Sequence, residues 1–224
     1  YLQPSNAVSV RTLCPWAKPA GCEVDCLGKK YGRLRMLLSQ NAMTRRTIQY
    51  VLNPDGVEDR LRSEILKNET DNYCIRLNGT SDANWSVLIS SLPNIQFYDY
   101  TEVFHRVARN TLSNYHLTYS ASLLNKKLIK KTKEDVAKGF NVALPLNTKE
   151  CKGEFKIPET VLVGGEKRPI ISFDDTDLRF LDPDNAIGSL TRKGSTKEQR
   201  ASELGSLNFF ADLYSIKLLE NTIL

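Results

Sequence analysis

Between residues 72 and 146 the sequence alternates segments typical of β-strands with amphipathic segments typical of helices. Strands joined by helical crossovers lie parallel, so this alternation predicts an α/β fold. We expect either a partial (β/α) barrel or an open parallel sheet. The predicted strands are 7–13, 72–82, 95–101, 114–122 and 141–146, and the helices between the last four are 85–94, 102–110 and 123–140.

Two further helices are predicted between the first and second strands. Apolar residues from Arg33 to Leu52 fall near helical spacing, and the NPDG run at 53–56 is expected to end that helix. A second helix follows, because Val57, Leu61 and Ile65 are four residues apart.

The length of 224 residues suits one domain, 1–224, whose parts differ in pattern. Residues 1–150 form the predicted β/α core. Residues 151–194 are β-rich and acidic, and include a β-hairpin over 159–173 with its turn at two consecutive glycines. Residues 195–224 predict a C-terminal helix that packs on the body of the domain.

Composition narrows the class of protein. With 41% hydrophobic and 25% charged residues, the chain is expected to form a packed globular fold. No apolar run approaches the roughly 20 residues that cross a bilayer, and no signal peptide is evident, so we expect a cytoplasmic protein with no membrane partner. The net charge of +5 is too small to identify a dedicated nucleic-acid binder.

Polar residues stand at the carboxyl ends of the predicted strands, where ligands bind in both candidate architectures. Carboxylates and a histidine at such positions suit acid–base chemistry, so Asp82, Asp99 and His116 are the candidate catalytic residues. The candidate cofactor-binding residues are Asn78, Thr80, Tyr100, Thr118, Ser120, Asp177 and Arg179.

Three of the five cysteines lie within thirteen residues, as Cys14, Cys22 and Cys26 in the pattern C-x7-C-x3-C. Three thiolates that leave one metal position open suit an iron-sulfur cluster. Zinc completed by Cys151 or a histidine is an alternative, as are ordinary thiols or a disulfide. We expect the loop to follow the first strand and to lie at the ligand-binding edge.

Two charged runs offer other functions. The acidic stretch from Asp174 to Asp184 supplies carboxylates that suit Mg²⁺ or Mn²⁺. The basic run NKKLIKKTK at 125–133 predicts a helix face that contacts phosphates, although such a run is more often a solvated surface.

Several stretches together resemble the gene product 88-like family of uncharacterised phage and mobile-element proteins. The matching stretches are CPWAKPAGCEVDCLGKKYGR, IRLNGTSDANW, FYDYT, NYHLTYSAS and DDTDLRFLDPDNAIGSLTRKG. The resemblance implies phage or plasmid origin, and hence the host cytoplasm, and brings no established activity.

The cysteine loop after the first strand is also similar, more distantly, to that of the radical S-adenosylmethionine enzymes. This likeness implies a [4Fe-4S] cluster on Cys14, Cys22 and Cys26, with S-adenosylmethionine on the open iron and a partial barrel around it. The chain departs from that pattern in two respects. The usual spacing is C-x3-C-x2-C, and NGTSD stands where those enzymes have Gly-Gly-Glu.

Three hypotheses follow. The first is an iron-sulfur enzyme similar to the radical S-adenosylmethionine enzymes, with a small-molecule or nucleic-acid-related substrate. The second is a metal-dependent hydrolase or nuclease that uses Asp82, Asp99 and Asp177, with structural zinc on the cysteines. The third is a phage effector without enzymatic activity that binds a host factor or nucleic acid through the basic helix.

Overall fold

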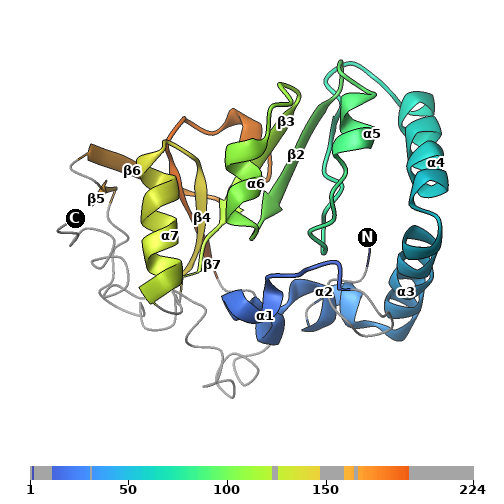
Figure 1. Ribbon diagram of the computed structural model, residues 1–224, viewed down its shortest axis with the longest axis horizontal. Helices are drawn as coiled ribbons and strands as arrows, with labels where there is room; N and C mark the ends of the chain where they lie inside the picture. The colour runs from blue at the N-terminus through green and yellow to red at the C-terminus, as the bar shows by residue number, and fades with distance from the viewer. Residues whose placement is uncertain are drawn as a thin grey trace. The chain divides into compact units, whose positions relative to one another are not determined.

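Seven strands form one mixed, mostly parallel sheet in the order β1-β2-β3-β4-β7-β6-β5 in the computed structural model (Figure 1). The structure describes residue 2 and residues 12–30, 32–122, 126–146, 159–163 and 166–191. The strands are β1 (Cys74–Ile75), β2 (Gln96–Thr101), β3 (Tyr115–Ser120), β4 (Val142–Leu146), β5 (Thr160–Val163), β6 (Glu166–Ser172) and β7 (Ile187–Thr191). Pairs β1–β2, β3–β4, β4–β7 and β6–β7 are parallel, and β5–β6 is antiparallel.

The helices predicted between residues 33 and 140 are present with adjusted ends, as α3 to α7, whereas no helix was predicted at α1 or α2. The α-helices are α1 (Ala17–Ala20), α2 (Leu27–Lys30), α3 (Leu37–Leu52), α4 (Pro54–Lys67), α5 (Ser86–Ser90), α6 (Phe104–Arg109) and α7 (Lys126–Ala137). Short 3₁₀ turns are η1 (Cys22–Asp25), η2 (Gly32–Arg35) and η3 (Arg179–Leu181).

The α/β class is therefore confirmed. The linear strand order is consistent with an open sheet, and a barrel is not confirmed. The hairpin predicted over 159–173 is β5 with β6. Most of the predicted strand 7–13 and the whole predicted helix 195–224 lie outside the described residues.

The chain divides into two compact units. Unit 1 comprises Tyr1–Pro15, Cys26–Tyr100 and Arg109–Leu117, and unit 2 comprises Trp16–Asp25, Thr101–Ala108 and Thr118–Leu224. The single-domain organisation expected for 1–224 stays a prediction.

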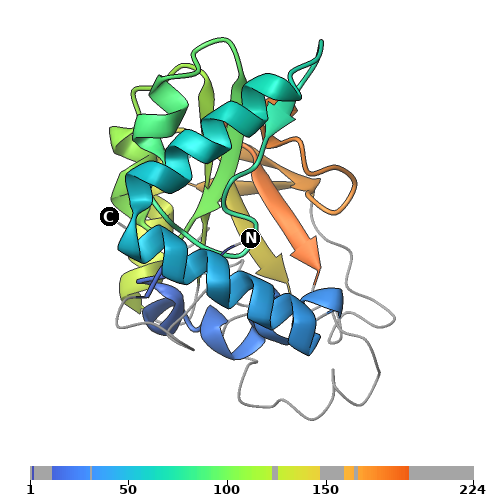
Figure 2. The same cartoon turned by 90° about the vertical axis from the view of Figure 1, so that its right-hand side faces the viewer.

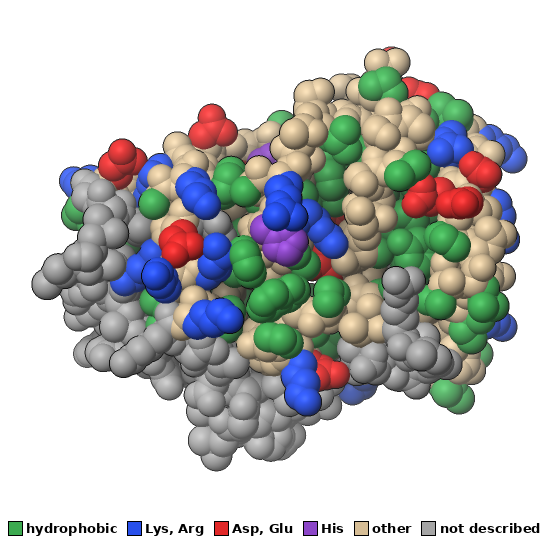
Figure 3. Space-filling model, viewed as in Figure 1, with side chains coloured by type: hydrophobic (Ala, Val, Ile, Leu, Met, Phe, Trp, Pro, Cys, Tyr) green, Lys and Arg blue, Asp and Glu red, His purple; other side chains and the backbone are tan. Residues whose placement is uncertain are grey.

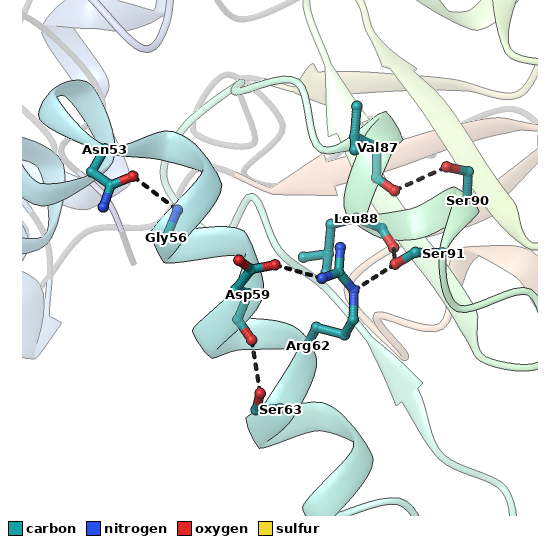
Figure 4. A network of polar contacts seen from close by, with 9 residues as sticks. All are labelled: Asn53, Gly56, Asp59, Arg62, Ser63, Val87, Leu88, Ser90 and Ser91. Atoms are coloured by element: carbon teal, nitrogen blue, oxygen red, sulfur yellow. Dashed lines mark hydrogen bonds and ion pairs between the residues drawn. The ribbon is translucent and has the colours of Figure 1, made fainter.

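In unit 1, one residue joins the two long helices. Asn53 ends α3, and its side-chain oxygen accepts the N–H of Gly56 at 3.0 Å to cap α4 (Figure 4). Pro54 then occupies the first turn of α4, where no N–H is needed. The NPDG run expected to end one helix thus also begins the next.

Helix α4 is joined to α5 by Arg62, also drawn in Figure 4. Its Nε donates to Ser91 Oγ at 2.9 Å, just beyond the end of α5, and its Nη1 forms an ion pair with Asp59 at 2.6 Å. The preceding helix α3 also contacts this region, because the ring of its Tyr50 lies 4.8 Å from the ring of Trp85, the residue directly before α5.

The core of unit 2 forms where α7 covers β4 and β5 (Figure 1). It contains the buried residues Tyr119, Ala121, Val136, Val142, Leu144, Val161 and Ile187. Strands β4 and β7 lie side by side in Figure 2, with Val142 opposite Ile187. Branched side chains suit such strands, because parallel sheets are covered on their faces.

Gly188 in β7 leaves room for a buried aromatic ring. A Cβ at this position would lie 2.1 Å from the ring of Phe173. The same ring lies 3.8 Å from the guanidinium carbon of Arg179, whose side chain is fully buried. Arg179 also pairs with Asp182 at 3.4 Å. The segment 173–188 is therefore built around an internal cation–π contact.

We expect Asn53→Ala to lower the free energy of unfolding by about 1 kcal/mol, because the first turn of α4 loses its cap. Urea denaturation followed by circular dichroism measures the change. Ser63→Ala, an exposed change later in the same helix, is the control and should cost less. Equal losses in the two variants would contradict the capping role.

Gly188→Ala should destabilise the protein by about 1–3 kcal/mol, because the added methyl group meets a ring that has no room to move. A double variant that also carries Phe173→Leu should lose less than the sum of the two single variants. Additive losses in thermal or urea unfolding would show that the ring and the glycine are not coupled.

Candidate functional site

A buried polar cluster in unit 1 centres on Asp99, near the carboxyl end of β2. The carboxylate is 1% exposed and accepts three hydrogen bonds. The backbone N–H of Asn78 donates to Oδ1 at 2.8 Å, and the hydroxyl of Tyr115 donates to Oδ2 at 3.1 Å. The amide Nδ2 of Asn78 lies 3.3 Å from Oδ2. These donors come from the loop after β1 and from the start of β3, so they fix the carboxylate from two sides.

Asn78 also organises the loop that follows β1. Its side-chain oxygen accepts hydrogen bonds from Ser81 Oγ at 2.9 Å, from the N–H of Ala83 at 3.0 Å and from Trp85 Nε1 at 3.1 Å. Its amide nitrogen donates to the carbonyl of Ala83 at 3.0 Å. The polar NGTSD stretch is therefore wrapped around one buried amide.

The same contacts explain why β1 is only two residues long. The strand was predicted over 72–82 with a break at Gly79, but the N–H of Asn78 already donates to the Asp99 side chain instead of to a backbone carbonyl of β2. The backbone ladder ends before this point, and the following residues form the loop.

The segment that begins the cysteine loop is attached to this cluster. The N–H of Asp82 donates to the carbonyl of Leu13 at 2.8 Å, directly before Cys14. The hydroxyl of Thr80 donates to the carbonyl of Leu2 at 2.7 Å. The residue directly before the first cysteine is therefore hydrogen-bonded to Asp82, one of the candidate strand-end residues.

Burial is the largest influence on Asp99 and raises the pKa of its carboxyl to about 7. The Asn78 N–H, the charge of Arg76 and the Tyr115 hydroxyl each act to lower this pKa, and the charge of Asp82 raises it. Near neutral pH the side chain is therefore present in both protonation states. Arg76 lies over the ring of Tyr100, with 4.7 Å between its guanidinium carbon and the ring centroid.

The family model described as Gene product 88 matches residues 1–204. This chain belongs to the gene product 88 family. The match supports the assignment to a phage-type family made from the sequence, whereas the likeness to radical S-adenosylmethionine enzymes is not supported. No curated protein and no solved structure matches the chain.

In this family member the candidate residues of unit 1 fall into two groups. Asn78, Asp82 and Asp99 come together, through the hydrogen bonds of Asn78 and through the charge of Asp82 acting on Asp99. Thr80 is instead bonded to Leu2, Tyr100 stacks under Arg76, and His116 is half-buried on β3.

The remaining candidates belong to unit 2. Thr118 is fully buried and Ser120 half-buried on β3. Asp177 is exposed, and its carbonyl accepts the N–H of Arg179 at 2.9 Å. The Arg179 guanidinium faces Phe173 and Asp182, which makes it part of the interior of the unit.

The described residues do not supply a metal site. Among them, no group of three or more His, Cys, Asp or Glu side chains is placed to hold a metal ion. Cys22 Sγ lies 3.6 Å from the carbonyl oxygen of Ala17, to which it donates a hydrogen bond. Cys151 lies outside the described residues. No reaction step is therefore assigned to a cluster or to zinc, and metal binding by the cysteine loop stays a prediction.

Sequence reasoning missed three members of the cluster. Tyr115, whose phenol makes its contact from the start of β3, was not among the candidate residues. Trp85 and Ser81 were not singled out. Arg76 did carry a signal, because it alternates with Ile75 toward the polar face.

Among the described helices, none is both long and apolar enough to span a membrane.

We expect the stability of the protein to fall as the pH rises through about 7, because Asp99 must then ionise while buried. Its folded pKa lies above the ordinary value of 3.8, so the folded state binds the proton more tightly than the unfolded chain. The contribution is complete below about pH 4, and its slope approaches about 1.4 kcal/mol per pH unit between about pH 5 and 7.

The isosteric Asp99→Asn variant should lack this component of the pH dependence, since an amide does not ionise. Urea unfolding at a series of pH values measures it. Asp71→Asn changes an exposed carboxylate in the same unit and should keep the wild-type profile. Parallel profiles for the wild type and the Asp99 variant would contradict the assigned pKa.

Proposed function

We propose that this protein is a hydrolase that uses Asp99 as its proton donor and Asp82 as its second carboxylate. The observation that carries the proposal is the Asp99 carboxyl, held by three hydrogen bonds near the carboxyl end of β2 with a pKa of about 7. Strongly shifted carboxyl groups concentrate at functional sites, because acid–base catalysis requires a pKa near the working pH.

Two carboxylates in different environments can divide the work of hydrolysis. Protonated Asp99 donates its proton to the leaving-group oxygen as the bond to that oxygen breaks. Asp82 accepts a proton from a water molecule, and the oxygen of that water forms a new bond to the substrate atom that the leaving group departs from. Exchange with solvent then returns a proton to Asp99 and removes one from Asp82, so both carboxyl groups regain their starting protonation states.

The charge near the cluster indicates the class of substrate. Arg76 acts on Asp99 and contributes a cation held over Tyr100. A guanidinium binds phosphate oxygens well, so a phosphoester is the substrate class that this cluster favours. Asp82 and Asp99 are both buried, and catalysis therefore requires the Asn78–Asp82 loop to open. The hydrogen bonds to Leu2 and Leu13 are the ones that such an opening would break.

The test is hydrolysis of phosphomonoester, phosphodiester and oligonucleotide substrates, each with and without added Mg²⁺ or Mn²⁺. Asp99→Asn should lower kcat by at least about 100-fold, and the pH profile of the wild type should show a limb near pH 7. Asp71→Asn is the matched control and should retain full activity. Equal activity in the two variants, or no turnover of any substrate, would contradict the proposal.

A second candidate, metal binding by the cysteine loop, is favoured by one contact. The hydrogen bond from Asp82 to Leu13 brings the residue before Cys14 to the loop that carries Asp82. Elemental analysis of anaerobically prepared protein distinguishes the options, with about four irons per chain for a [4Fe-4S] cluster and about one zinc for a structural site. Metal-free protein with an intact fold would exclude this candidate.

A further inference from the structure

One face of α7 in unit 2 exposes a row of lysines. The buried stripe of the helix is Leu128, Thr132 and Val136, which lie four residues apart and turn toward the core of the unit. The opposite side exposes Lys127, Lys130 and Lys138, the last just beyond the helix end. Within the described residues these three ammonium groups have no ion-pair partner. Figure 3 shows Lys and Arg side chains gathered over α6 and α7.

The lysines are close enough to act together. Glu134 forms an ion pair with Lys131 at 3.0 Å, and the pKa of its carboxyl is lowered by that hydrogen bond and by the charges of Lys131, Lys130 and Lys138. These cations therefore produce a shared positive field along one helix face. At about 1.5 Å per residue, Lys127 and Lys138 are about 16 Å apart along the axis.

Rings from other segments of unit 2 lie beside this face. The ammonium of Lys131 is 4.2 Å from the centroid of the Phe104 ring, which connects α7 to α6. Trp16 and His105 contact the same ring edge-on, with centroids 5.5 Å and 5.2 Å away. His105 is exposed and Trp16 half-buried. The sequence showed no aromatic residues interleaved with the basic run, because these rings come from residues 16 and 104–105.

Cations spaced along a surface bind phosphates, and exposed rings beside them stack on unpaired bases. A duplex buries its bases and would use only the cations. We infer that the face formed by α7, Phe104, His105 and Trp16 binds single-stranded nucleic acid. The inference rests on contacts within unit 2 and does not depend on the proposed hydrolase activity of Asp99.

The test measures the fluorescence anisotropy of labelled single-stranded DNA and RNA of about 12 nucleotides, and of a duplex of equal length, against the full-length protein. Salt is varied between about 50 and 200 mM. The triple variant Lys127→Gln, Lys130→Gln, Lys138→Gln should bind single strands at least about tenfold more weakly. The slope of log affinity against log salt should become smaller in magnitude by about 2, because each of the three lost phosphate contacts contributes about 0.7 to it.

A matched control removes three exposed charges from α3 and α4, as Arg45→Gln, Arg60→Gln, Lys67→Gln. It has the same net charge as the first triple variant and should keep wild-type affinity. His105→Ala should weaken single-strand binding by about fivefold or more and leave duplex binding unchanged. Because all these side chains are exposed, thermal unfolding should show an intact fold in each variant.

Three results would overturn the inference. They are no binding by the wild type at about 50 mM salt, equal losses in the two triple variants, and a duplex affinity that matches the single-strand affinity. A protein that binds single strands but hydrolyses nothing would support this inference and contradict the proposed function, so the two fail separately.

Discussion

The side chain of Asn78 holds together the buried polar cluster of unit 1 on which the proposed function depends. One buried amide accepts from Ser81, Ala83 and Trp85, donates back to Ala83 and lies beside Asp99. A hydrogen bond contributes only about 1 kcal/mol net, but a buried group left without its partner costs more. Such a network is therefore stable when complete and costly when any one member is lost.

The network also explains how a carboxylate is tolerated in the interior. Burial disfavours the charge on Asp99, and the donors from Asn78 and Tyr115 compensate for part of that cost. A leucine or methionine at this position would avoid the cost of burying a charge, but it would remove the acceptor of the Asn78 N–H and of the Tyr115 hydroxyl. An ionisable group there lowers stability and provides a carboxyl that titrates near neutral pH, which under the proposed hydrolase function is an exchange of stability for activity.

Much of the fold could be predicted from the sequence, because periodicity is a local property. The strands β2, β3 and β4 and the helices α6 and α7 follow directly from alternating or helical spacing. The length of β1 could not be predicted, because it depends on the acceptor of the Asn78 N–H. That acceptor is the side chain of Asp99, 21 residues away. The role of Arg179 was hidden for a similar reason. Its partners Phe173 and Asp182 are near in sequence, but an arginine in an acidic stretch gives no sign that it is fully buried.

The use of Asn53 at two helix ends has a consequence for how the chain can vary in length. Since the residue that ends α3 also caps α4, no linker separates the two helices. An inserted residue would remove the cap from its place and rotate α4 by about 100° per residue about its axis. The contact of Tyr50 in α3 with Trp85 and the contact of Arg62 in α4 with Ser91 could then no longer form at the same time. Relatives with longer or shorter chains are therefore expected to keep this junction constant in length and to place their insertions elsewhere.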